Sequence, residues 1–226
     1  PRDFGEAEVD ENIETKSYER EQVLSDQKPI NELIDGLNNS VKPILLVGEL
    51  ARGENVRDLL VKLSDKLEAP VISAYRCQDA VENHHPCYAG HLEINPVNYQ
   101  DKLFRESDFI VVLGSRLDGI TSREETLVKE DDKWAHIHPD NIVLQRFNAD
   151  ISVQSDVVPL LTDIMDRIEQ KDNKDNVWRS EAHDDYLNFS TAGTYPVNGS
   201  VDLSYVAKTA RELLPSKSIV LTDGGS

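Results

Sequence analysis

The chain has 226 residues, of which 38% are hydrophobic and 29% are charged, and this composition is typical of a folded globular protein. Its formal net charge of -18 argues against nucleic acid and anionic membrane surfaces as partners, because no stretch rich in lysine or arginine compensates for it. No apolar run approaches the roughly 20 residues that cross a bilayer, no secretory pattern opens the sequence, and two cysteines are too few for a disulfide framework, so we expect a cytoplasmic protein.

Helical spacing and short solid apolar runs alternate along the first 170 residues. Residues 1–27 lack an apolar period, and we predict that they form an interdomain linker. Helical spacing predicts helices over residues 30–39, 56–67, 99–106 and 157–168, the last with Ser155 or Asp156 as its N-cap. Apolar runs predict buried strands over residues 43–47, 70–74, 109–113 and 134–138, with a weaker strand over 150–154. The segment 75–96 has no clean period and is predicted to be a long loop.

This alternation predicts an α/β fold. We expect a doubly wound, mostly parallel sheet of the Rossmann-like type over residues 28–171, with helices on both faces. In such sheets ligands bind at the carboxyl ends of the strands. Those ends are predicted at Gly48-Glu49, Tyr75-Arg76, Gly114-Ser115-Arg116 and His138-Pro139-Asp140.

The composition changes after Gln170. Residues 172–200 are predicted to be a linker with a short helix near 178–189. A helix over 201–214 and a strand over 219–222 then form an incomplete second α/β piece, residues 201–226. A single parallel-type strand cannot bury both of its faces, so we expect the sequence to be cut from a longer protein.

Several segments carry motifs in the order of one known family. Pro1-Arg-Asp-Phe4 looks like the exit of an N-terminal domain, and residues 42–48 and 68–72 resemble the first two strands of a central domain. His85-Pro-Cys-Tyr-Ala-Gly90 is similar to a His-Pro-x-x-x-Gly loop, and residues 107–117 match a strand that ends in Gly-Ser-Arg-Leu. Residues 136–140 sit at a further strand end, and 202–224 look like the start of a C-terminal domain. Together they resemble thiamine-diphosphate-dependent 2-oxo-acid enzymes of the acetolactate synthase type.

The resemblance implies that the parent enzyme is a decarboxylase or carboligase acting on pyruvate or a similar acid, with thiamine diphosphate and Mg²⁺. The family's catalytic Glu would precede Pro1 and its metal-binding motif would follow Ser226, so we assign no catalytic residue and no metal ligand here. The fragment alone is expected to be structural and inactive. Residues expected near the cofactor are Asp223, Gly224, Gly225 and Ser226. The expected partners are the N-terminal and C-terminal domains, in a homodimer or homotetramer.

The family's central domain binds flavin in some members, ADP or CoA in others, and nothing in the rest. The resemblance places such a site at Gly48, Gly90, His91, Gly114, Ser115, Arg116, Asp118, His138 and Asp140. Gly114 and Arg116 suit a phosphate. Glu49 and Leu50 replace a glycine-rich turn, however, and His138 replaces an Asp, so the sequence favours a supporting domain over a flavin or ADP site.

The sequence also allows other interpretations, namely a metal site and two alternative functions. A loop with Cys and His at short spacing lacks the Cys-x-x-Cys pattern of zinc sites, so packing is favoured; its members are Cys77, His84, His85, Cys87 and His91. His136 and His138 share a strand face. The alternative functions are a free-standing adenine-nucleotide (flavin, ADP or CoA) binding module and an NAD-dependent deacylase, whose Gly-Ala-Gly entry loop and catalytic His context are not found.

Overall fold

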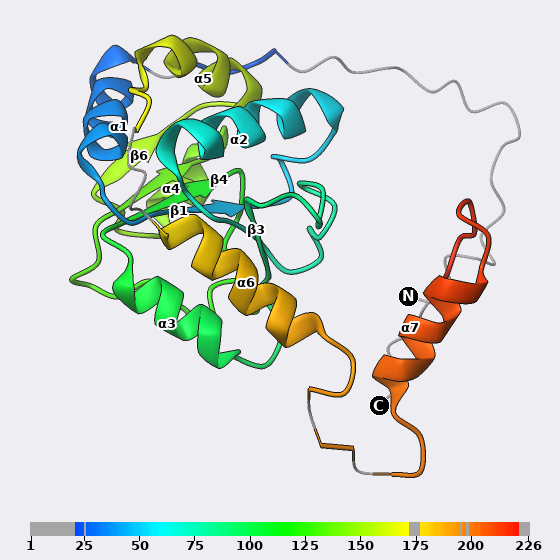
Figure 1. The fold of residues 1–226 in the computed structure, drawn as a ribbon. Coiled ribbons are helices and arrows are strands. Elements are labelled where there is room, and N and C mark those ends of the chain that lie inside the picture. Colours follow the sequence, from blue (N-terminus) through cyan, green and yellow to red (C-terminus); the bar gives the residue numbers. More distant parts are fainter. Residues whose placement is uncertain (1–20, 25, 172–176, 195, 198, 222–226) are drawn as a thin grey trace, which may run out of the picture.

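A computed structural model describes residues 21–24, 26–171, 177–194, 196–197 and 199–221. Up to residue 170 the chain contains the predicted strands and helices in the predicted order, together with two short elements that were not predicted (Figure 1). The strands are β1 (Pro43–Val47), β2 (Val71–Ser73), β3 (Tyr88–His91), β4 (Phe109–Leu113), β5 (Trp134–Ile137) and β6 (Ile151–Val153). The helices are α1 (Gln27–Asn39), α2 (Glu54–Leu67), α3 (Asn98–Glu106), α4 (Asn141–Gln145), α5 (Val157–Ile164), α6 (Trp178–Ser190) and α7 (Leu203–Leu213), and a short 3₁₀ turn, Met165–Arg167, continues α5.

The strands form one six-stranded sheet in the order β3-β2-β1-β4-β5-β6. Every pair of neighbouring strands is parallel. β2 and β3 therefore lie on one side of β1, and the chain then crosses back so that β4, β5 and β6 lie on the other side. This doubly wound α/β topology confirms the predicted fold class.

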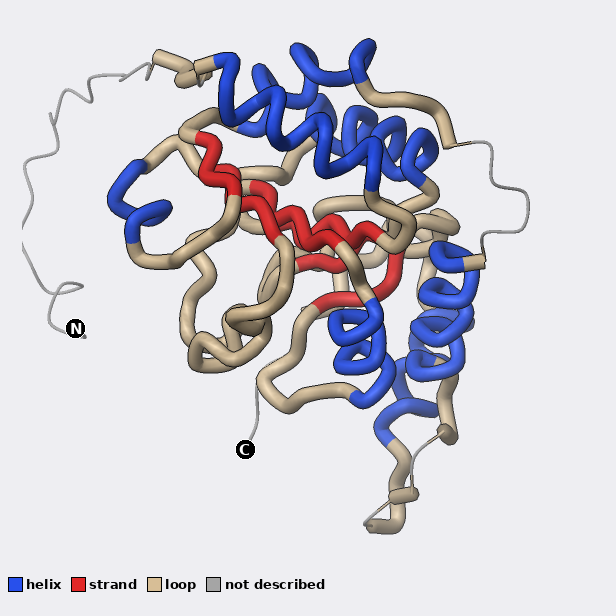
Figure 2. The backbone as a smooth tube through the Cα atoms, turned by 90° about the vertical axis from the view of Figure 1, so that its left-hand side faces the viewer, coloured by secondary structure: helices blue, strands red, loops and turns tan. Residues whose placement is uncertain are grey.

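Helices lie on both faces of the sheet (Figure 2), and an apolar layer fills the space between the sheet and the helices on each face. Successive residues of β1 and β4 point to opposite faces, because the side-chain period of a strand is two. One layer joins α1, α2 and α5 to strand residues such as Leu45 and Val111. The other joins α3 and α6 to Ile44 and Val112. A sheet buried on both faces explains why its central strands are solid apolar runs.

Two short elements were not predicted. β3 lies inside the segment 75–96, which we predicted to be a loop, and it pairs with β2 through Val71 opposite Tyr88. α4 follows β5, and Asp140 is its N-cap, accepting a hydrogen bond from Ile142 N at 2.9 Å. The predicted strand at 219–222 is wrong for residues 219–221, which form neither helix nor strand. A parallel strand requires a neighbour to pair with, and Ile219 is 89% exposed.

The α6 helix packs on the sheet although the sequence placed it in a linker. Trp178 and Ala182 are buried. The Trp178 indole donates Nε1–H to the carbonyl of Pro43 at 2.9 Å, and Tyr186 meets the ring of Tyr88 edge-on at 4.9 Å. The helix that follows, α7, buries none of its residues.

The end of the predicted N-terminal linker also contacts the sheet domain. Val23 N–H donates to the carboxylate of Asp156 at 2.7 Å, and the Asp156 N–H donates to the Val23 carbonyl at 2.8 Å. Asp156 occupies the N-cap position of α5. This residue thus joins the start of α5 to the segment that leads into α1.

The connection from β4 to β5 contains turns but no helix. Three successive non-glycine residues within it, Arg123, Glu124 and Glu125, have positive φ angles of 51°, 53° and 66°. Leu117 and Leu127 anchor this connection in the second apolar layer. Among the residues that the structure describes, no helix has the length and apolarity to cross a membrane.

Candidate functional site at the switch point of the sheet

The order of the strands reverses between β1 and β4. Just past these strands, Gly48 N–H donates to the Leu113 carbonyl and Gly114 N–H donates to the Ile137 carbonyl, both at 2.9 Å. Open α/β sheets bind ligands beside the carboxyl ends of their strands at such a reversal. Residues 48–53 after β1 and 114–118 after β4 are therefore the candidate site, and we call them the switch-point turns.

The two switch-point turns touch each other through backbone. A Cβ atom on Gly48 would lie 2.3 Å from Ser115 Cβ and 2.4 Å from its Cα, so a side chain does not fit there. Gly114 has a φ of +65°, a left-handed conformation that glycine adopts without strain. Its carbonyl accepts the Leu50 N–H at 2.9 Å. Both glycines therefore serve the close approach of the two turns.

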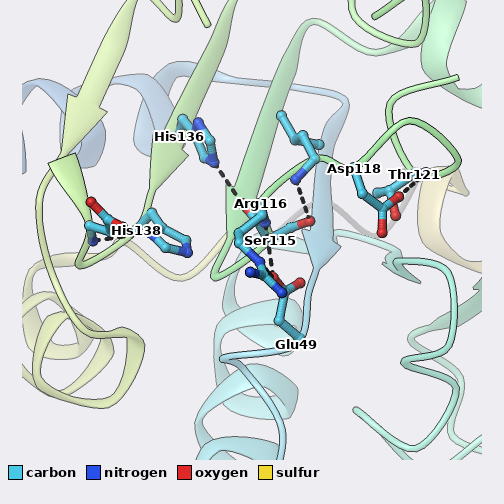
Figure 3. Close-up of polar contacts among 9 residues, drawn as sticks. Glu49, Ser115, Arg116, Asp118, Thr121, His136 and His138 are labelled. Carbon is cyan, nitrogen blue, oxygen red and sulfur yellow. Dashed lines mark hydrogen bonds and ion pairs between the residues drawn. The ribbon is translucent and has the colours of Figure 1, made fainter. Parts of the chain in front are cut away.

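An ion pair joins the turns (Figure 3). Glu49 Oε1 accepts from the backbone N–H of Arg116 at 3.2 Å and from its Nε–H at 3.0 Å. The Glu49 side chain is 34% exposed and that of Arg116 is 68% exposed, so the pair contributes at most about 1 kcal/mol to stability. The arginine that the sequence predicted for a phosphate is thus paired with a carboxylate of its own chain.

His136 lies under the turn that follows β4. It is completely buried, and its Nε2 lies 2.8 Å from the Ser115 carbonyl (Figure 3). A carbonyl only accepts, so Nε2 carries the proton and Nδ1 is the bare nitrogen. Nδ1 has no hydrogen-bond partner within the described part of the chain. Burial lowers the pKa of His136 to about 4, which keeps the ring neutral near pH 7.

His138 lies two residues further on, just past the end of β5, with its ring directed toward Arg116 (Figure 3). Its Nδ1 accepts the Asp140 N–H at 3.0 Å, so the proton of the neutral ring is on Nε2. That buried Nε2–H has no acceptor among the described residues. Burial lowers the pKa of His138, and the charge of nearby Glu49 opposes this effect. His138, which the sequence analysis noted as the replacement for an Asp, therefore offers a donor and not a carboxylate at this position.

The two predicted carboxylates of the site hold local turns. Asp118 Oδ1 accepts the Thr121 N–H at 2.8 Å, and this bond shapes the start of the β4–β5 connection. Asp140 caps α4 through Ile142. Each carboxylate is thus engaged by backbone within three residues of its own position, as is usual for Asp in turns and caps.

Gly90 and His91 lie apart from the other predicted site residues. Both belong to β3, which β2 and β1 separate from β4. Gly90 has a φ of +90°, and a Cβ there would lie 2.3 Å from Tyr99 Oη. His91 Nε2 lies 3.0 Å from Glu93 Oε1. The remaining predicted residues, Asp223, Gly224, Gly225 and Ser226, lie outside the described residues.

The loop with cysteine and histidine is a packed segment. Cys77 and Cys87 are buried free thiols, and burial raises the pKa of each to about 11. His85 Nδ1 accepts the Cys87 N–H at 3.2 Å. No three His, Cys, Asp or Glu side chains gather in a metal-binding group in the part of the chain that the structure describes.

The switch-point turns do not fit the phosphates of a nucleotide. The backbone N–H of Arg116 is taken by Glu49, and that of Leu117 by Ser115 Oγ at 3.1 Å. The negative charge of Glu49 stands where a phosphate would need donors. The residues expected near thiamine diphosphate and Mg²⁺ lie outside the described ranges, so no fit with either group follows from this structure.

Comparison with known families identifies the domain. The sequence model of the family described as thiamine pyrophosphate enzyme, central domain, matches residues 30–164, which is more than half of the chain. The chain belongs to this family. The matched residues contain all six strands of the sheet, so the resemblance seen in the sequence motifs is confirmed.

Relatives of this central domain are longer proteins. An acetolactate synthase of Arthrospira platensis is 24% identical over 177 residues, which cover 74% of this chain and 30% of that protein. A sulfoacetaldehyde acetyltransferase of Rhodobacter capsulatus is 34% identical over 82 residues, or 36% of this chain and 14% of that protein. A solved structure from Mycobacterium smegmatis, assigned to the thiamin diphosphate-dependent enzymes, shares the fold with a TM-score of 0.57 and 18% identity, covering 72% of this chain and 31% of that one. The chain thus spans less than a third of the length of each.

One feature of the site escaped the sequence reasoning. The sequence analysis noted Glu49 only as a replacement for a glycine-rich turn, and it did not predict the pairing of Glu49 with Arg116, which is 67 residues away. A signal for it exists in the sequence. The two residues carry opposite charges directly after two apolar runs, and these runs become neighbouring strands.

Proposed function

We propose that this chain is the central part of a thiamine-diphosphate-dependent enzyme that decarboxylates pyruvate or a similar 2-oxo acid and transfers the product to a second carbonyl compound. The observation that carries the proposal is the family match across all six strands. An acetolactate synthase among the relatives supports the choice of substrate class. The cofactor, when bound with Mg²⁺, supplies the nucleophilic and electron-accepting chemistry.

In this proposal the chain itself is a scaffold rather than a catalyst. Its partners are an N-terminal domain and a C-terminal domain of the same enzyme, which works as a homodimer or homotetramer in the cytoplasm. The exposed apolar side chains of α7 support a covering domain: Leu203 is 77% exposed and Leu213 is 79% exposed. Large apolar residues gathered along one exposed helix mark a contact surface.

The test compares pyruvate consumption by the full-length protein that contains this sequence with consumption by these 226 residues alone, each with thiamine diphosphate and Mg²⁺. Turnover by the former and none by the latter is expected. Turnover by this chain alone would contradict the scaffold role. If the full-length protein leaves pyruvate untouched, the pyruvate assignment fails, and other 2-oxo acids should be tried in the same assay.

The alternative of a free-standing module for flavin, ADP or CoA receives less support. It requires donors for phosphate at the switch-point turns, and Glu49 engages both the backbone N–H and the Nε–H of Arg116. A titration with ADP separates the two functions without any turnover assay, because only the module predicts binding.

A further inference from the structure

The switch point of this sheet has the topology of a dinucleotide site but carries acidic residues in place of the expected donors. In such folds phosphate groups lie at the turn after the first strand and at the N-terminus of the helix that follows. Here that turn contains Glu49, and the first turn of α2 contains Glu54. The Glu49 carboxylate would face the negative charge of a phosphate, and Arg52 in the same turn is paired with Asp79 at 2.7 Å.

The donors that follow β4 are also occupied by groups of the chain. Glu49 Oε1 takes the backbone N–H and the Nε–H of Arg116. Ser115 Oγ takes the Leu117 N–H, and Asp118 takes the Thr121 N–H. Four donors of this segment are thus engaged by groups of the same chain.

The backbone contact between the two turns fixes this arrangement. Leu50 N–H donates to the Gly114 carbonyl at 2.9 Å, and Gly48 lies so close to Ser115 that a Cβ atom would clash at 2.3 Å. Glu49 lies between these two contacts in the sequence. Its backbone is therefore held on both sides, and its carboxylate is kept within reach of Arg116.

We infer that Glu49 is an internal anion that takes the place of a nucleotide phosphate at the switch point, so that this domain keeps the dinucleotide fold while excluding nucleotides. The carboxylate balances the charge of Arg116 and engages its backbone N–H and its Nε–H. The function proposed above does not enter this inference, which concerns only the residues of the switch-point turns.

The experiment is a calorimetric titration of the chain with ADP, repeated with adenosine. The wild-type protein should show no saturable heat with ADP at millimolar concentration. Glu49→Gln keeps the size of the side chain and one oxygen but removes the charge. We expect this variant to bind ADP at least roughly tenfold more tightly than the wild-type limit, since juxtaposed like charges strongly disfavour binding. Adenosine, which lacks phosphate, should behave alike with both proteins.

Two further variants locate the effect. Adding Arg116→Ala to Glu49→Gln should abolish the gained ADP binding, because it removes the freed guanidinium. Glu32→Gln is the matched control: it neutralises a carboxylate on α1 that faces Lys28 at 3.9 Å and is not part of the switch-point turns, so this variant should bind no ADP. Circular dichroism checks that each variant is folded, and Glu49→Ala replaces Glu49→Gln if the latter is not.

Two results would overturn the inference. One is saturable binding of ADP to the wild-type protein that is lost on Arg116→Ala, since the donors would then be available despite Glu49. The other is a folded Glu49→Gln or Glu49→Ala protein that binds ADP no better than wild type. In that case the carboxylate is not what excludes the phosphate.

Discussion

Protonation of buried His136 should make the fold less stable as the pH falls through the range just below neutrality. Its ring has an ordinary pKa of 6.5 in the unfolded chain and a pKa of about 4 in the folded one, because burial disfavours the charged form. Protonation would add an N–H at Nδ1, an atom for which the described residues provide no acceptor. Between these two values the unfolded chain binds a proton that the folded chain excludes, so the free energy of unfolding falls with falling pH.

The expected size follows from the linkage relation. Between pH 7.5 and pH 5.0, one histidine with these two pKa values lowers the free energy of unfolding by roughly 2 kcal/mol. The window stops at pH 5.0 because ordinary carboxylates begin to titrate below it. Burial lowers the pKa of His138 as well, so the total decrease in the free energy of unfolding of the wild type should exceed the contribution of His136. His138 is present in both the wild type and the His136 variant, so its contribution cancels when the two are compared.

The assay is urea unfolding of wild type and His136→Gln at pH 7.5 and pH 5.0. Gln retains a side-chain donor for the Ser115 carbonyl but has no titrating group. The variant should be less stable than wild type at pH 7.5 and should lose about 2 kcal/mol less on acidification. Equal losses for His136→Gln and wild type would refute the reasoning.

Three further substitutions test the packing by urea unfolding at neutral pH. Gly48→Ala should lower the free energy of unfolding by about 2 to 3 kcal/mol, because its Cβ would lie 2.3 Å from Ser115 Cβ. Gly199→Ala, where a Cβ would have nothing within 4 Å, should change the free energy of unfolding little. Equal effects of the two substitutions would contradict the close approach of the turns. Trp178→Ala should lower the free energy of unfolding by about 3 to 5 kcal/mol, because Trp178 is 6% exposed. A decrease of less than about 1 kcal/mol would mean that α6 is not part of the domain. Leu213→Ser should stay within about 0.5 kcal/mol of wild type, because Leu213 is 79% exposed; a larger loss would show that the chain itself covers α7.

The parts of the fold that followed from the sequence are those with strong local patterns. β1 and β4 are unbroken apolar runs, and every residue of both is buried. The apolar positions of α1 and α2 recur at helical spacing and lie on the buried faces. β3 could not be predicted in the same way, because Tyr-Ala-Gly-His has no apolar run and gains its strand geometry from pairing with β2. Tertiary pairing, rather than propensity, decides such a segment.

The position of the switch-point turns was predictable, but their contacts were not. Strand ends fall where apolar runs stop, and the reversal of strand order then brings Gly48 beside Ser115. The pairing of Glu49 with Arg116 depends on which strands become neighbours, and the local sequence around either residue does not determine this. The buried state of His136 likewise follows from the β4–β5 turn lying over it, with Ser115 as its partner.

The position of α6 has a consequence for the order in which the domain is completed during synthesis. β3 forms one edge of the sheet, and the helix that lies along it comes after the strand at the opposite edge, β6. Trp178 and Pro43, which form a hydrogen bond, are separated by 135 residues. A nascent chain that has not yet released residue 190 therefore leaves β3 as an uncovered edge, the kind of surface that invites pairing with other chains.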